Sequence, residues 1–175
     1  MIHLWEAELI ASDAHRGQTD KNGVPYIEHA LAVAAGLRDF PLEVQVAGVL
    51  HDVVEDTGWS LEDLLVAGVT KVSLRLIDAV TKVPGSSKEE QIHRVITVGG
   101  YSACLVKISD NAHNSLPDRL KHLDGETRKR LERKYREARE KLWSCVSPED
   151  IEKILRIVNP SLLAELAEMR REAGL

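Results

Sequence analysis

Residues 49–64, which read VLHDVVEDTGWSLEDL, place an adjacent histidine and aspartate at the end of an apolar run. A second acidic pair, Glu55 and Asp56, follows His51 and Asp52 by one helical turn. On one helix, His51 and Glu55 would share a face, and Asp52 and Asp56 would share the neighbouring face. The stretch therefore predicts a polar patch at the end of a helix whose other sides are buried.

Apolar residues recur at helical spacing along most of the chain. Residues 42–56 are expected to form one helix, which Gly58 ends. No alternating pattern typical of strands is present, and neither is an internal repeat. We therefore predict an all-α fold with one domain over residues 1–175, a motif core at about 11–114 and C-terminal helices over 125–175. Other helical stretches are expected at 4–15, 26–37, 61–66, 72–82, 88–96, 103–108, 125–144, after Ser147 and after Pro160.

The composition is that of an ordinary globular protein, with 43% hydrophobic and 29% charged residues among 175. The net charge of −5 argues against binding to a nucleic-acid polymer, because phosphate backbones require a basic surface. No apolar run predicts a membrane span, and no signal peptide is recognised, so a cytoplasmic location is expected. Cys104 and Cys145 form no CxxC pair, which favours two small, buried, reduced thiols over a zinc ribbon.

Two more polar residues lie inside apolar helical stretches, His29 in YIEHALAVA and Asp110 in LVKISDNAHN. Alone, each has a structural interpretation, since a core histidine can be satisfied by a hydrogen bond and an aspartate can cap a helix. Burying several such groups without partners is costly, however, and a bound metal removes that cost. Together with His51 and Asp52 they would make a mixed nitrogen and oxygen site, which suits Mn²⁺, Fe²⁺ or Zn²⁺.

Three blocks carry a resemblance to the HD superfamily of metal-dependent phosphohydrolases. Residues 14–34, AHRGQTDKNGVPYIEHALAVA, resemble the AHxGQ…PYIxHP block of RelA/SpoT hydrolase domains and of the small alarmone hydrolases, including the metazoan SpoT homologue. Residues 49–64 resemble the LLHDxVEDT block, which is more specific than a bare His-Asp pair, and residues 105–114 resemble KLADRLHN. The helix around residues 133–142, RKYREAREKL, also fits. The resemblance implies a single-domain helical HD fold.

By this resemblance, Glu55 and Asp56 would be the catalytic acids. The chemistry agrees, because a carboxylate that binds no metal can orient or deprotonate the attacking water. Mn²⁺ is the implied ion, with other divalent transition metals left open. Members of the family remove the 3′-pyrophosphate of guanosine tetra- or pentaphosphate, alarmones of the stringent response, giving GDP or GTP. The implied metal ligands are His29, His51, Asp52 and Asp110.

The expected substrate contacts are Lys21, Lys107, Asn114 and Tyr135. Asn114 and Tyr135 match family positions near the nucleotide, whereas Lys107 has equal claims as a phosphate contact and as a surface lysine. Asp20 stands where many relatives carry a basic residue that stacks on guanine. Either Lys21 takes over that contact, or Asp20 weakens guanine binding, in which case Asp20→Arg would lower KM for the guanosine substrate.

The reaction type is therefore better founded than the substrate, and three functions stay open. The first is hydrolysis of the guanosine alarmone. The second is hydrolysis of another small nucleotide, such as an adenosine alarmone, NADPH or a nucleoside phosphate. The third is a catalytically silent nucleotide-binding module, against which the retained pair Glu55 and Asp56 argues. A homo-oligomer is also left open by the sequence.

Overall fold

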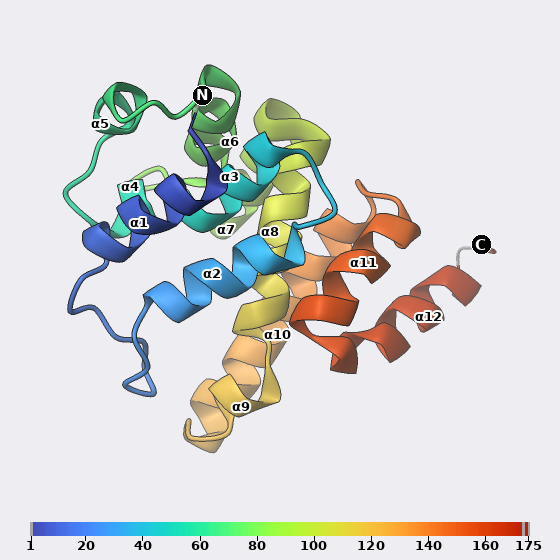
Figure 1. Cartoon of the computed structure of the whole chain (residues 1–175). Helices are drawn as coiled ribbons and strands as arrows, with labels where there is room; N and C mark the ends of the chain where they lie inside the picture. The colour runs from blue at the N-terminus through green and yellow to red at the C-terminus, as the bar shows by residue number, and fades with distance from the viewer. Residues whose placement is uncertain (1, 173, 175) are drawn as a thin grey trace.

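The computed structural model describes residues 2–172 and 174, and within them the chain folds into helices without a β-strand (Figure 1). One isolated antiparallel bridge, between Thr19 and Pro25, closes the loop before the second helix. The all-α prediction is confirmed. The helices are α1 (Leu4–Ala14), α2 (Ile27–Gly36), α3 (Leu42–Leu50), α4 (Val53–Asp56), α5 (Leu61–Val66), α6 (Lys71–Val80), α7 (Lys88–Arg94), the π-helix η1 (Val95–Gly99), α8 (Gly100–Asn114), α9 (Pro117–Leu120), α10 (Gly125–Trp143), α11 (Pro148–Val158), the 3₁₀-helix η2 (Pro160–Leu162) and α12 (Leu163–Glu172).

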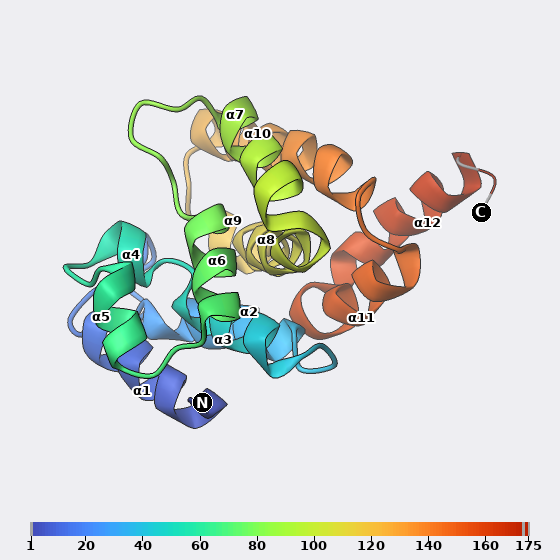
Figure 2. The same cartoon turned by 90° about the horizontal axis from the view of Figure 1, so that it is seen from above.

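Helix α8 runs through the middle of the bundle (Figures 1 and 2) and packs against α2, α3, α6, α10 and α11. Its apolar residues are buried almost without exception, and so are most residues of α3. Apart from Leu120 and Leu131, the buried apolar side chains of the described residues form one continuous cluster, as expected of a single domain with one core. Polar side chains on α2, α3 and α8 are consequently brought together inside the bundle.

Three helix starts that the sequence predicts are present with their caps. The side chains of Ser60, Ser87 and Ser147 each accept a hydrogen bond from the backbone N–H three residues later. At Ser60, the carboxylate of Asp63 returns the bond to the cap backbone, which completes the capping box. These local signals explain why α5, α7 and α11 begin where they do.

The prediction of a single helix over residues 42–56 is wrong. Helix α3 ends at Leu50, His51 and Asp52 form a turn, and the short helix α4 follows. At Asp52 the backbone leaves regular helical geometry, with φ −103° and ψ −4°, which interrupts the helical hydrogen-bond ladder. The His-Asp pair therefore lies at a joint between two helices, so His51, in the turn, and Glu55, on α4, do not share the face of one helix.

No loop separates the helical stretches expected at 88–96 and 103–108, although Gly99 and Gly100 lie between them. The chain passes from η1 directly into α8, which extends over the whole of LVKISDNAHN. A Cβ added at Gly99 would lie 2.3 Å from the Cβ of Ala103 and 2.8 Å from that of Ala79, so the close approach of α6 requires glycine there. Gly100 has φ +63°, a conformation that favours glycine.

Two smaller expectations concern membranes and thiols. No helix among residues 2–172 is long and apolar enough to cross a bilayer. Both cysteines are free, but only Cys104 is buried, whereas Cys145 is partly exposed. The expectation of two buried thiols is thus correct for one of them.

Candidate metal centre and active site

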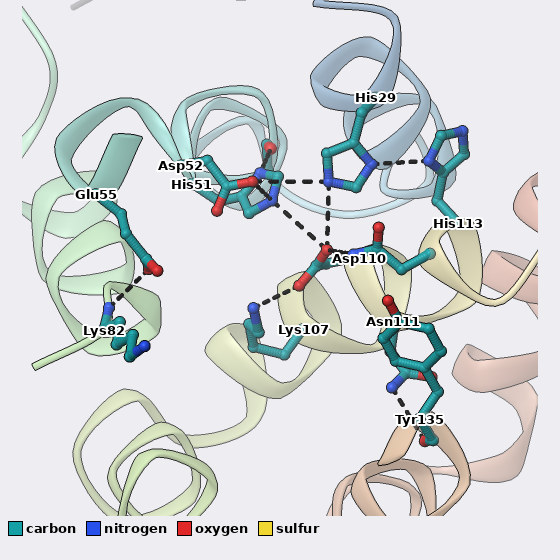
Figure 3. A network of polar contacts seen from close by, with 12 residues as sticks. His29, His51, Asp52, Glu55, Lys82, Lys107, Asp110, Asn111, His113 and Tyr135 are labelled. Carbon is teal, nitrogen blue, oxygen red and sulfur yellow. Dashed lines mark hydrogen bonds and ion pairs between the residues drawn. The ribbon is translucent and has the colours of Figure 1, made fainter. Parts of the chain in front are cut away.

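Four side chains from three parts of the chain meet inside the bundle (Figure 3). His29 comes from α2, His51 and Asp52 from the turn after α3, and Asp110 from the middle of α8. The Nε2 atom of His51 lies 2.8 Å from Oδ2 of Asp52 and 3.7 Å from Oδ1 of Asp110. The Nε2 atom of His29 lies 3.3 Å from Oδ1 of Asp110 and 3.7 Å from Oδ2 of Asp52. Each of the two Nε2 atoms therefore lies within 3.7 Å of one carboxylate oxygen of Asp52 and one of Asp110.

This cluster fits a transition-metal ion. Both imidazole Nε2 atoms are buried and, among the described residues, make no hydrogen bond of acceptable geometry. Two ligands bound to one ion at about 2.1 Å lie about 3.0–3.4 Å apart, close to the 2.8–3.7 Å between the nitrogen and oxygen atoms of this cluster. One atom each of His29, His51 and Asp52 also falls within a common 4.8 Å. Neutral imidazoles and carboxylates are the donors that such ions accept.

The far sides of the two imidazoles are each held by a partner. Nδ1 of His51 lies 2.8 Å from the backbone carbonyl oxygen of Gly48 and can only donate to it. Nδ1 of His29 lies 2.7 Å from Nδ1 of His113, on α8. Second contacts of this kind fix the orientation of ligating histidines in metalloproteins.

The two carboxylates are held in the same way. The hydroxyl of Tyr26 donates to Oδ2 of Asp52 at 2.5 Å. The amide of Asn114 donates to Oδ1 of Asp110 at 2.6 Å, and the ammonium of Lys107 donates to its Oδ2. Each carboxylate is thus oriented before any ion binds.

The electrostatics of the metal-free cluster are those of a buried ion-pair network. Burial opposes charge on His51, but Asp52 and Asp110 outweigh it and raise the pKa of His51 to about 10. Burial also opposes ionisation of Asp110, but Lys107 and the two histidines outweigh it and hold the pKa of that carboxyl well below its usual range. For His113, burial and the neighbouring His29 ring lower the pKa to about 4.

A cavity of about 810 Å³ opens over the cluster, between it and helices α7 and α10. Its volume lies within the range of small-molecule sites. Acidic side chains line it at the cluster, namely Asp52, Glu55, Asp56 and Asp110, and on α7 and α10, namely Glu89 and Glu137. Five lysines line it as well, namely Lys82, Lys88, Lys107, Lys134 and Lys141. A ligand with negatively charged groups, one of them at the centre, would match this lining.

Both predicted catalytic acids line the cavity beside the cluster. Oε2 of Glu55 accepts a hydrogen bond from the backbone N–H of Lys82 at 2.9 Å, which turns Glu55 toward the loop after α6 (Figure 3). Asp56 is anchored through its backbone oxygen, which accepts from the amide of Gln18 at 2.9 Å. Partial desolvation, Asp52 and Glu55 raise the pKa of the Asp56 carboxyl.

The predicted substrate contacts divide into two groups. Lys107, Asn114 and Tyr135 line the cavity, although the first two also bond Asp110. Lys21 is exposed in the loop before α2 and does not line the cavity.

Asp20 faces neither the cavity nor the solvent. Its carboxylate accepts hydrogen bonds from the backbone N–H groups of Asn22 and Val24, at 2.8 and 3.1 Å, and it pairs with Arg119 at 3.1 Å. Only 7% of the Asp20 side chain is exposed. It holds the loop together, which neither interpretation from the sequence anticipated.

Tyr26 and His113 are the residues of the site that sequence reasoning undervalued. The sequence assigned Tyr26 no role at the site, but its hydroxyl donates a hydrogen bond to Asp52. A usable signal is its position three residues before His29, because residues so spaced share a helical face. His113 has the same spacing from Asp110, but its contact with His29 joins residues 84 apart in sequence, which no local pattern predicts.

Comparisons with known proteins agree with this geometry. The model of the HD domain family matches residues 7–114, which contain all four side chains of the cluster. Over 145 residues, or 71% of this chain, the sequence is 34% identical to the bifunctional (p)ppGpp synthase/hydrolase SpoT of Escherichia coli (strain K12) and to the guanosine-3′,5′-bis(diphosphate) 3′-pyrophosphohydrolase of Escherichia coli O157:H7. The match spans only 20% of the length of these two relatives.

A solved structure of a metazoan ortholog of SpoT that hydrolyses ppGpp has the same fold. The two structures superpose with a TM-score of 0.66 over 87% of this chain and 93% of that one, at 24% sequence identity. The family match covers more than half of the chain and includes its buried cluster. The chain therefore belongs to the HD domain family.

Proposed function

We propose that this chain hydrolyses the 3′-pyrophosphate of guanosine tetra- or pentaphosphate, giving GDP or GTP and pyrophosphate. The observation that carries the proposal is the cluster of two histidines and two aspartates at the wall of a cavity that is also lined by Glu55, Asp56 and five lysines. A relative named for this reaction, from Escherichia coli O157:H7, shares 34% identity with the chain over 71% of its length.

His29, His51, Asp52 and Asp110 would hold the ion, and Mn²⁺ is the ion we propose. Two imidazoles and two carboxylates give a donor set of intermediate hardness, which Mn²⁺ and Fe²⁺ accept as readily as Zn²⁺. The chemistry that a divalent cation supplies when bound is acidification of water and neutralisation of phosphoryl charge.

Asp56 and Glu55 would handle the protons. The reaction consumes one water, whose oxygen joins the phosphorus, while the 3′ oxygen of the ribose leaves and takes up a proton. Asp56 is the better base of the two, because desolvation and its acidic neighbours raise the pKa of its carboxyl. Glu55, whose position is fixed by the Lys82 backbone, would orient the water or the leaving hydroxyl.

The lysines along the cavity would hold the polyphosphate. Lys88, Lys134 and Lys141 lie on α7 and α10, away from the acidic cluster, and Lys141 pairs with Glu89 at 2.7 Å. Substrate charge would thus meet cations on one side and the metal centre on the other, which favours an elongated anion over a single phosphate. Tyr135, on the same wall, offers an aromatic surface to the nucleoside.

A second candidate is hydrolysis of another small nucleotide by the same centre. It is favoured by Asp20, which is engaged with Arg119 and leaves this position without a cation directed into the cavity. An adenosine alarmone or NADPH would use the same centre and the same lysines.

The test is a nucleotide panel. The purified chain, loaded with Mn²⁺, is incubated with guanosine tetraphosphate, its adenosine counterpart, NADPH and GTP, and products are separated by ion-exchange chromatography. The proposal expects GDP and pyrophosphate from guanosine tetraphosphate, and loss of both when a chelator is added. Turnover of another member of the panel alone would select the second candidate, and binding without turnover would select the silent module.

A further inference from the structure

The contact between His29 and His113 is a hydrogen bond in which both partners are imidazoles (Figure 3). The two Nδ1 atoms lie 2.7 Å apart, and the ring centroids lie 4.9 Å apart. The side chain of His29 is 1% exposed, so water does not compete for its Nδ1. His113 lies on α8, three residues after Asp110, and is therefore fixed to the same rigid element as that carboxylate.

Two nitrogens at this distance require one proton between them. A neutral imidazole carries its proton on one nitrogen and leaves a lone pair on the other. If His113 donated, Nδ1 of His29 would be the acceptor, and the Nε2 atom of a neutral His29 would carry a proton directed at Asp110. If His29 donates, its Nε2 is unprotonated and presents a lone pair to the point shared by the four side chains. Only the second arrangement allows His29 to bind a metal.

For His51, the other histidine of the cluster, the direction of the Nδ1 hydrogen bond is not in question. Nδ1 of His51 faces the backbone carbonyl of Gly48, which can only accept, so the backbone fixes its tautomer. For His29 the corresponding acceptor is a side chain, and the tautomer therefore depends on the residue at position 113.

We propose that His113 is a positioning residue of the metal centre. Its Nδ1 accepts the Nδ1–H of His29 and so keeps Nε2 of His29 unprotonated and aimed at the ion, while its own proton resides on Nε2. The proposal rests on the metal-binding part of the proposed function and assigns His113 no contact with substrate.

The first test compares His113→Leu and His113→Asn, with His122→Leu as the matched control. Leucine fills the space without an acceptor, whereas Oδ1 of asparagine stands near the position of Nδ1 and can accept the same bond. His122 is exposed, so the control makes the same chemical change away from the cluster. Affinity for Mn²⁺ is measured by competition with a chromogenic chelator, together with the Mn²⁺ dependence of turnover.

His113→Leu should bind Mn²⁺ about 10- to 100-fold more weakly, the usual cost of losing a partner of a ligating histidine. His113→Asn and His122→Leu should stay close to wild type. Excess Mn²⁺ should restore turnover of His113→Leu with an unchanged KM for the nucleotide, which a general loss of structure would not do. Equal affinity of the leucine and asparagine variants would overturn the inference while leaving the proposed function intact. A wild-type chain that binds no metal would overturn both.

A second measurement needs no substitution and decides the matter if His113→Leu fails to fold. Long-range proton–nitrogen NMR spectra of the ¹⁵N-histidine-labelled wild type, loaded with diamagnetic Zn²⁺, report which ring nitrogens carry protons. The inference expects the proton of His29 on Nδ1 and that of His113 on Nε2. A proton on Nδ1 of His113 would overturn it.

Discussion

Replacing Tyr26 with phenylalanine removes one hydroxyl and leaves the ring in place. That hydroxyl donates to Oδ2 of Asp52 at 2.5 Å, and the same oxygen lies 2.8 Å from Nε2 of His51. Asp52 has only 16% of its side chain exposed, so water is a poor substitute for the lost donor. Tyr26→Phe should therefore release the carboxylate from the orientation that suits an ion.

The expected loss can be sized from the bond itself. A hydrogen bond to a charged group contributes about 1.5–3 kcal/mol, which corresponds to about 10- to 150-fold in an equilibrium constant. Only the part that acts on the metal-bound state appears in the affinity, so we expect Tyr26→Phe to bind Mn²⁺ about 10- to 100-fold more weakly. Turnover at subsaturating Mn²⁺ should fall by the same factor.

Tyr101→Phe is the matched control. Its hydroxyl also donates to an aspartate, Asp150, at 2.7 Å, but this pair lies between the start of α8 and α11, outside the cavity. Thermal unfolding and Mn²⁺ competition are measured for both variants. If Tyr26→Phe bound Mn²⁺ as tightly as Tyr101→Phe and the wild type, the assignment of Asp52 as an oriented ligand would be wrong.

Three further predictions concern the acids, the protons and the loop. Glu55→Gln combined with Asp56→Asn should lower kcat by about 10²–10⁴-fold with metal content unchanged by elemental analysis; a double variant that turns over at the wild-type rate would contradict these roles. Burial lowers the pKa of His51, but the carboxylates of Asp52 and Asp110 outweigh this effect and raise the pKa to about 10. His51 therefore carries a proton at neutral pH, which Mn²⁺ must displace. Calorimetry in buffers of different ionisation enthalpy should detect proton release, and affinity should fall as the pH is lowered from about 8 to about 6; a pH-independent affinity would speak against His51 as a ligand. Asp20→Arg should reduce the free energy of unfolding by about 2 kcal/mol and so lower Tm, because it places a second cation beside Arg119 and removes the hydrogen bonds that hold the loop. A lower KM for guanosine tetraphosphate at unchanged Tm would instead support a base contact at this position.

The helical pattern and the caps were predictable because they depend on neighbours in sequence. Ser60, Ser87 and Ser147 each mark a helix start through a bond to a residue three positions away. The break at His51 and Asp52 was not predictable in this way, since the apolar period continues through it and only the backbone geometry reveals the joint.

The site residues, too, were predictable where a sequence pattern marks them and not where they depend on how the helices pack. The order of histidines and aspartates, read with the family blocks, selected the four residues that the fold brings together. Their partners depend on how α2 and α8 pack, so the contacts of Tyr26 and His113 could not be read from spacing alone. At Asp20 the family comparison misled, because it suggested a role in base recognition, whereas the carboxylate pairs with Arg119 and holds the loop.

Hydrolysis of the 3′-pyrophosphate should require one metal ion at the histidine–aspartate cluster. The most direct measurement titrates the metal-free chain with Mn²⁺ and follows the initial rate of GDP release from guanosine tetraphosphate against bound metal. We expect no release without metal and a rate that rises in proportion to bound Mn²⁺ until each chain holds one ion. Full turnover by the metal-free chain, or a fully loaded chain that releases no GDP, would contradict it.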